Sequence, residues 1–179
     1  MRTLAASLGV LPAAALAFTL QSGEVKPDGT IANAQVYNSL GCNGGNISPS
    51  LVWKDPPAET KSFAVTVFDP DAPTGQGWWH WVVFNIPPDT LSLPAGAGDP
   101  AAGKLPAGAV QVRTDYGESG YGGPCPPRGD KPHRYVFTVY ALKTDKLNAD
   151  ASTAAARLGS LIEANQIGKA TLTAKYGRK

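Results

Sequence analysis

The sequence has few charged residues, and this shortage excludes several classes of protein. Charged residues make up 17% of the 179 residues, and 16 Lys and Arg against 14 Asp and Glu give a formal net charge of +2. This balance provides no clustered basic face for duplex nucleic acid, so we expect no nucleic-acid partner. The 20 Gly and 16 Pro follow no Gly-X-Y period and 42% of the residues are hydrophobic, which excludes collagen, coiled-coil and strongly disordered chains.

The sequence also lacks a long hydrophobic run. Its one uncharged apolar stretch, residues 4–16, is shorter than the roughly 20 residues that a membrane-spanning helix needs. The stretch follows Arg2 and leads into Ala15-Leu16-Ala17, the small-x-small pattern that a signal peptidase cleaves. A buried N-terminal helix is the alternative. We predict that residues 1–17 are a cleaved signal peptide, and that residues 18–179 form a single domain, periplasmic or secreted, with no membrane-spanning segment.

Cysteine is nearly absent. Cys42 and Cys125 are the only two, and neither belongs to a Cys-x-x-Cys motif, which argues against redox catalysis. In the oxidising compartment that a signal peptide implies, an even pair of cysteines is more often bridged than free. We therefore predict a Cys42–Cys125 disulfide, with two reduced, partly buried thiols as the alternative.

The hydrophobic pattern predicts a mainly β domain. Residues 61–69, 79–86 and 134–142 are apolar on both faces, which is typical of strands buried on both sides. Shorter strands are expected at residues 24–26, 50–53 and 170–176, and residues 87–108 predict a long Pro- and Gly-rich loop. One helix is expected at residues 151–165, capped by Asp150 or Ser152 and ended by Gly168. Many strands with one helix and no βαβ rhythm predict a sandwich-like fold with an antiparallel-rich sheet.

Both histidines of the chain lie in two Pro-rich segments at the ends of the predicted core strands. If these strands are neighbours, the two histidines and Asp69 meet at one end of the sheet. Proline-fixed loops are rigid and suit a preformed pocket, and Gly122 and Gly123 would let backbone N–H groups approach an anion. The two segments supply these candidates: Asp69, Asp71 and His80 from the first, and Gly123 and His133 from the second.

Each candidate also has a purely structural interpretation. The aspartates could form Asx-turns beside proline, the histidines could be satisfied structural residues, and the tryptophans could be core. The combination of two Asp with both His in Pro-fixed loops favours a binding site. A metal-dependent phosphoester hydrolase that uses these four residues as ligands is the alternative function. Because no separate general base is visible, we expect no enzyme activity and no cofactor.

Two motifs carry a resemblance to a known family. The first motif is Asp69-Pro70-Asp71-Ala72-Pro73 with the His80-Trp81 strand. The second is Gly-Pro-Cys-Pro-Pro followed by His133-Arg134-Tyr135. Both motifs resemble the phosphatidylethanolamine-binding protein family, in its bacterial Raf kinase inhibitor-like (YbhB/YbcL) branch. The resemblance implies a β-sandwich whose small cavity takes phosphate-like anions or phospholipid head groups, without a metal. It also implies that the matching residues line this cavity, with Trp78 as a pocket aromatic; they are Asp69, Asp71, Pro73, His80, Pro126, Pro127, His133 and Tyr135. A role as modulator or inhibitor of an unknown protein partner, and a homodimer, stay open.

Overall fold

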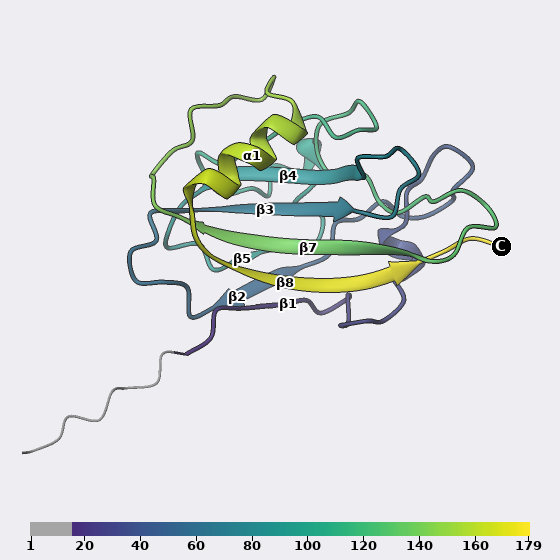
Figure 1. Ribbon diagram of the computed structural model, residues 1–179, viewed down its shortest axis with the longest axis horizontal. Helices are drawn as coiled ribbons and strands as arrows, with labels where there is room; N and C mark the ends of the chain where they lie inside the picture. Colours follow the sequence, from purple (N-terminus) through teal and green to yellow (C-terminus); the bar gives the residue numbers. More distant parts are fainter. Residues whose placement is uncertain (1–15) are drawn as a thin grey trace, which may run out of the picture.

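Two antiparallel sheets form the centre of the protein (Figure 1). The computed structural model describes residues 16–179, so most of the predicted signal peptide lies outside the described residues. The larger sheet has five strands in the order β6 (Val110–Gln111), β4 (Trp78–Ile86), β3 (Ser62–Asp69), β7 (His133–Leu142) and β8 (Gln166–Tyr176). The smaller sheet has the order β1 (Thr19–Gln21), β2 (Leu51–Lys54) and β5 (Ser92–Leu93). Helix α1 spans Ala155–Asn165, and two 3-10 turns lie at Asn33–Gln35 and Pro100–Ala102.

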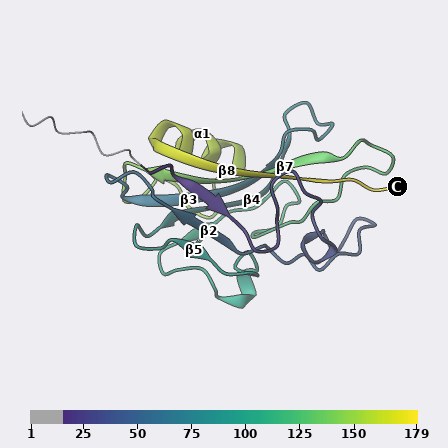
Figure 2. The same cartoon turned by 90° about the horizontal axis from the view of Figure 1, so that it is seen from below.

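The elements form three layers. Figure 2 shows α1 on one face of the five-stranded sheet and the three-stranded sheet on the other. One apolar cluster, which includes Phe63 and Trp53, fills the space between the two sheets. A second cluster, which includes Val82 and Leu158, fills the space between the sheet and α1. The central strands are therefore buried on both faces, as their sequence pattern predicts, and the predicted mainly β sandwich with one helix is confirmed.

The predictions for two short or irregular segments, residues 24–26 and 87–108, are wrong in detail. Residues 24–26 form no strand; the edge strand β1 lies before them at Thr19–Gln21 and pairs with β2. The Glu24 carboxylate instead accepts hydrogen bonds from the backbone N–H (3.0 Å) and hydroxyl (2.6 Å) of Ser50, which ties the loop to the start of β2. Residues 87–108 are not wholly irregular, since they contain β5 and the 3-10 turn at Pro100–Ala102.

The helix begins at Ala155, later than the predicted residue 151, and it ends at Asn165 as predicted. Asp150 accepts hydrogen bonds from the backbone and hydroxyl of Ser152, so these residues form a turn before the helix, and Ala154 is the N-cap without a side-chain bond. At the other end, the Asn165 carbonyl accepts from the backbone N–H of Lys143 at 3.0 Å. The helix therefore ends at Asn165, β8 begins at the next residue, and Gly168 lies inside β8 opposite Ala141.

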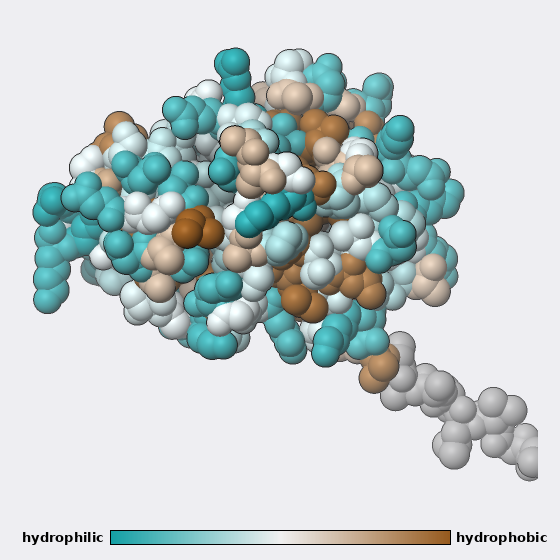
Figure 3. Space-filling view, turned by 180° about the vertical axis from the view of Figure 1, so that it is seen from behind, coloured by the Kyte–Doolittle hydropathy of each residue, from teal (hydrophilic) through white to brown (hydrophobic). Residues whose placement is uncertain are grey.

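Apolar residues at the surface are scattered. The exposed large apolar side chains within residues 16–179 are Leu16, Leu40, Ile47, Val52, Leu91 and Ile167. Figure 3 shows the face opposite to that of Figure 1, on which apolar residues form small separate groups among polar ones. Isolated apolar residues of this kind are ordinary on protein surfaces and do not by themselves indicate a partner. No helix in the described part of the chain is long and apolar enough to cross a membrane.

Candidate functional site

Three neighbouring strands bring the two histidines and Asp69 together. β3 runs antiparallel to both β4 and β7, so the end of β3 lies beside the beginnings of the other two strands. Asp69, the last residue of β3, pairs directly with Trp78, the first residue of β4. A cavity of about 240 Å³ opens at this end of the sheet. Eight predicted residues line it, namely Asp69, Pro73, Trp78, His80, Pro126, Pro127, His133 and Tyr135.

Asp69 and His133 form a buried hydrogen-bonded pair. His133 Nδ1 lies 2.7 Å from Asp69 Oδ2, and both side chains are almost fully buried. The other carboxylate oxygen of Asp69 accepts the backbone N–H of Asp71 at 2.8 Å. Because an ionised carboxylate only accepts hydrogen bonds, His133 Nδ1 carries the proton. The pair thus fixes the orientation of the imidazole, whose Nε2 lies 3.4 Å from Asp130 Oδ2.

His80 reaches the cavity through a β-bulge. On β4 Trp79 pairs with Phe68 and Trp81 pairs with Val67, so two steps along β4 match one step along β3 and His80 is the extra residue. A bulge of this kind re-aims side chains. His80 Nδ1 lies 2.7 Å from the Gly122 carbonyl, and the His80 carbonyl accepts the Gly122 N–H. Burial lowers the pKa of His80 to about 4, so its ring is neutral at pH 7.

Two buried donors in the cavity lining have no partner. Trp78 Nε1 and the Tyr135 hydroxyl are both buried and make no hydrogen bond. Both residues line the cavity with His80. Burial, and then the negative charge of Asp69, raise the pKa of Tyr135, so its hydroxyl keeps its proton. Trp53 Nε1, in the core between the two sheets, is sealed and unpartnered in the same way, so these two donors do not by themselves mark a ligand position.

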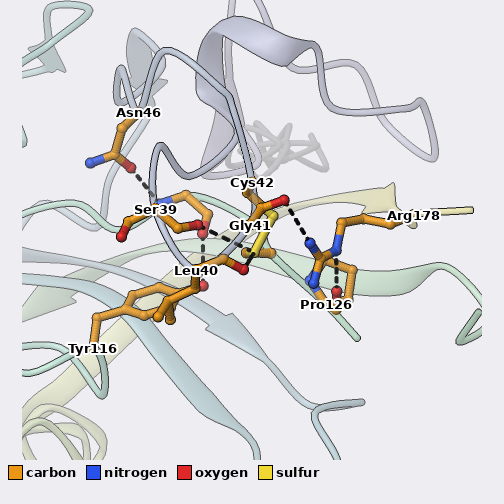
Figure 4. Close-up of a disulfide and its surroundings, with 10 residues drawn as sticks. Ser39, Leu40, Gly41, Cys42, Asn46, Tyr116, Pro126 and Arg178 are labelled. Atoms are coloured by element: carbon orange, nitrogen blue, oxygen red, sulfur yellow. Dashed lines mark hydrogen bonds between the residues drawn. A yellow bond between two sulfur atoms is a disulfide. The ribbon is translucent and has the colours of Figure 1, made fainter. Parts of the chain in front are cut away.

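The predicted Cys42–Cys125 disulfide is confirmed, and it forms part of the cavity wall. The Cα atoms of the two cysteines lie 6.0 Å apart, and Cys125 lines the cavity together with Leu40. Figure 4 shows the loop around Leu40 against the disulfide, with Arg178 beside it. Arg178 donates to the carbonyls of Gly41 (3.1 Å) and Pro126 (2.6 Å). A covalent bond and two charged hydrogen bonds therefore hold this wall in place.

Asp71 and Gly123 do not line the cavity. Asp71 accepts hydrogen bonds from the backbone N–H, Nε and Nη2 of Arg134, and this pair lies outside the cavity. The N–H groups of Gly122 and Gly123 already donate to the His80 carbonyl and Asn46 Oδ1. A Cβ at Gly123 would lie 2.1 Å from the Gln35 carbonyl, so close packing explains the glycine. The expectation that these amides approach an anion is wrong.

We predict that Asp71 stabilises the fold, because it is paired with Arg134. Its hydrogen bonds from Arg134 lower the pKa of Asp71 from 3.8 to about 2. Such a carboxylate stabilises the fold above its unfolded pKa, and this contribution is lost as the pH falls from about 4 to 2. Asp71→Asn should lower the free energy of unfolding by about 1 kcal/mol or less at pH 7, because the pair is partly exposed. Near pH 2 it should leave the free energy of unfolding unchanged. Urea unfolding at both pH values measures the free energy of unfolding. A loss of ligand affinity in the variant would contradict the placement of Asp71 outside the cavity.

Five lining residues were missed by sequence reasoning: Leu40, Ala72, Thr74, Tyr116 and Cys125. Tyr116 stacks on Tyr37 with ring centroids 4.1 Å apart and donates its hydroxyl hydrogen bond to the Gly123 carbonyl. It lies in a turn outside the predicted strands, so no periodicity marks it. Cys125 could have been found, because it directly precedes Pro126, which was predicted to line the pocket.

The hydrolase alternative gains no support from the geometry. Among residues 16–179, no group of three or more His, Cys, Asp and Glu side chains is disposed to hold a metal ion. Asp71, one of the four ligands that this alternative requires, is engaged by Arg134 instead. The arrangement is that of a small cavity with hydrogen-bond donors and acceptors, on a two-sheet sandwich.

Comparisons with known proteins agree with this class. The family model described as phosphatidylethanolamine-binding protein matches residues 21–177. The UPF0098 protein YbcL of Escherichia coli K12 is 52% identical over 164 residues, which cover 92% of this chain and 90% of YbcL. The UPF0098 protein YbhB of the same strain is 45% identical over 157 residues, which cover 88% of this chain and 98% of YbhB. The chain belongs to the phosphatidylethanolamine-binding protein family.

Solved structures show the same fold. The crystal structure of Escherichia coli YbcL, described as a new member of the mammalian family, matches with a TM-score of 0.89 and 51% identity, covering 90% of this chain and 99% of that one. The homologue CT736 from Chlamydia trachomatis matches with a TM-score of 0.75 and 32% identity, covering 91% and 99%. The predicted family resemblance, including its YbhB/YbcL branch, is confirmed.

Proposed function

We propose that the protein binds small phosphate-like anions or phospholipid head groups in the cavity at the end of β3, β4 and β7. The observation that carries the proposal is a cavity of about 240 Å³ whose lining combines His80 and the hydrogen-bonded Asp69–His133 pair with apolar walls. These walls are formed by Leu40, Pro73, Pro126 and Pro127, and the low local dielectric that they create strengthens hydrogen bonds to a ligand.

The size of the cavity supports a small ligand. A volume of about 240 Å³ is below the range of drug-sized pockets, which begins at roughly 300 Å³. The walls are also built before a ligand arrives, since the prolines fix the backbone and the disulfide joins two of the loops. A preformed small cavity loses little conformational entropy on binding. We propose a binding protein without enzymatic activity; a role as modulator of other proteins and a homodimer stay predictions.

Tyr135→Phe should separate binding from stability. The change removes a hydroxyl that is buried without a partner, so the free energy of unfolding should stay constant or rise. A hydrogen bond to a charged group contributes roughly 1.5–3 kcal/mol, so affinity for phosphoethanolamine should fall about 10- to 100-fold. Calorimetric titration and urea unfolding of the same preparation measure the two effects.

A pair of tryptophan variants provides the control. Trp53 Nε1 is also buried without a partner, but Trp53 lies in the core between the two sheets and does not line the cavity. Trp78→Phe should weaken phosphoethanolamine binding, whereas Trp53→Phe should lower only stability. Unchanged affinity in both Trp78→Phe and Tyr135→Phe would place the anion site elsewhere.

We also propose that the protein is exported. The disulfide supports this, because disulfides persist mainly in oxidising compartments. Phe18 supports the cleavage position, since it packs against the core, with its ring centroid 6.4 Å from that of Phe63. Cleavage after Ala17 would thus begin the mature chain at the first packed side chain among residues 16–179. N-terminal sequencing of protein from a periplasmic extract or culture medium should find Phe18 first; retention of Met1 would refute this.

A further inference from the structure

We infer that the protein docks on anionic lipid bilayers through a basic face that lies outside the cavity. The face is formed by the Lys and Arg side chains of residues 128–134 and 175–179, namely Arg128, Lys131, Arg134, Lys175, Arg178 and Lys179. None of these six residues lines the cavity, so this contact goes beyond the proposed function.

Formal charge is unevenly distributed along the chain. The two segments of the basic face contain six basic residues and one acidic residue and so carry +5, which leaves −3 for the rest of a chain whose net charge is +2. A net charge near zero therefore did not predict this clustered basic face. A charge distribution of this kind orients a protein toward an anionic surface and attracts it over about 10 Å at 0.1 M salt.

The fold places these cations side by side. Arg134 on β7 pairs directly with Lys175 on β8, and Arg128 forms a backbone bridge with Arg178. Lys131 lines a surface hollow together with both members of the first pair. Figure 1 shows this end of β7 and β8 beside the C-terminus. Like charges directly opposite one another destabilise a sheet, so stability does not explain why cations gather here.

Carboxylates offset only part of this charge. Arg134 forms an ion pair with Asp71, and the other acidic residues in the hollows of the face are Asp28 and Asp130. The four ion pairs among residues 16–179 include none of the cations Arg128, Lys131, Lys175 and Lys179. Three aspartates against six cations leave the face positively charged.

An anionic bilayer fits this face better than a protein does. Protein interfaces are built around buried apolar and aromatic anchors, and no large apolar side chain is exposed in the two segments. Leu40, which is 69% exposed, lies beside the face, because Arg178 donates to the Gly41 carbonyl (Figure 4). Basic residues with an apolar side chain at their edge are typical of binding to a membrane surface.

The position of the cavity favours a bilayer over nucleic acid. His133 lines both the cavity and the hollow that Lys131 and Lys175 share, so both sites lie at the same end of the sheet. A protein docked through the basic face would bring its cavity to the membrane surface. This choice between two anionic partners rests on the proposed function, because a bilayer carries the head groups proposed for the cavity.

The test is sedimentation of the full protein with vesicles of equal parts phosphatidylglycerol and phosphatidylcholine, compared with phosphatidylcholine alone. At about 0.05 M salt the anionic vesicles should bind at least about 30-fold more tightly, and about 0.5 M salt should remove this preference. Each Lys near such a surface contributes about fivefold, so Lys131→Gln/Lys175→Gln should bind about 30-fold more weakly. Because Lys175 faces Arg134, urea unfolding should show a variant no less stable than wild type.

Lys61→Gln/Lys143→Gln is the matched control. These two exposed lysines lie together at the opposite end of the sheet, where the Lys61 N–H donates to the Leu142 carbonyl, and their replacement changes the net charge equally. Vesicle affinity should stay within about twofold of wild type. Equal losses in the two double variants would overturn the inference, because net charge and not the basic face would then attract the vesicles.

Further outcomes separate the inference from the proposed function. Excess phosphoethanolamine should leave vesicle binding intact; if it releases the protein, the cavity holds the membrane, and the inference fails while the proposed function stands. Vesicle binding by a protein that does not bind phosphoethanolamine would uphold the inference and overturn the proposed function. Tighter binding to duplex DNA than to the anionic vesicles at equal salt would overturn the inference.

Discussion

Replacing both cysteines by serine should lower the free energy of unfolding by roughly 4 kcal/mol, which is what loop closure predicts for a long loop. The bridge joins residues 83 positions apart, so the oxidised unfolded chain loses much of its freedom. For a protein of this length the change corresponds to a fall in Tm of roughly 8–16 °C. Urea unfolding of Cys42→Ser/Cys125→Ser against the oxidised wild-type protein measures it.

The same variant should also weaken ligand binding, because Cys125 and Leu40 form one wall of the cavity. Leu40 has φ of 53° and Gly41 has φ of 76°, and a left-handed backbone at Leu40 persists only where its surroundings hold it. Arg178→Ala is the matched control, since it removes the hydrogen bonds to Gly41 and Pro126 but keeps the disulfide. It should reduce affinity with a far smaller loss of stability. An unfolding free energy of the double-serine variant within 1 kcal/mol of wild type would contradict the prediction.

Val139→Asp should prevent folding. Val139 lies in the middle of β7, fully buried between Val65 on β3 and Ala170 on β8. A carboxylate there has no partner and faces the apolar cluster between the two sheets. An unpaired buried charge costs more than about 4 kcal/mol, a large part of the 5–15 kcal/mol that stabilises a typical domain. Circular dichroism and thermal unfolding should show the loss of the folded state.

Val52→Asp is the matched control, because it makes the same change at an exposed position of a strand. Val52 lies in β2, pairs with Gln21 and Ser92, and is 39% exposed. Its replacement should change stability by less than about 1 kcal/mol. A folded Val139→Asp protein with a Tm close to that of Val52→Asp would show that the centre of the sheet is less tightly packed than the structure indicates.

Local patterns determined the large elements of this fold. Residues 62–69, 78–86 and 133–142 are apolar on both faces, and such runs have no stable place except between two layers. The weak predictions were those where a local signal competed with a distant contact. Residues 24–26 look like a strand, yet the Glu24 carboxylate is held by Ser50. The helix ends at the predicted residue, Asn165, but the Asn165 carbonyl accepts from the distant Lys143 N–H, and Gly168, the expected stop, lies inside β8.

Some features of the candidate site could likewise be predicted from local patterns, whereas others depend on distant contacts. The sequence alone determined its chemical components, because two histidines, aspartates and prolines at strand ends are visible as motifs, and it determined the disulfide partners, because only two cysteines exist. Only the tertiary structure decided which atoms face the cavity. The bulge at His80 depends on the register between β3 and β4, and the outward turn of Asp71 depends on Arg134. The nitrogen that carries each histidine proton is determined by a hydrogen-bond acceptor more than 40 positions away, and no local pattern encodes such contacts.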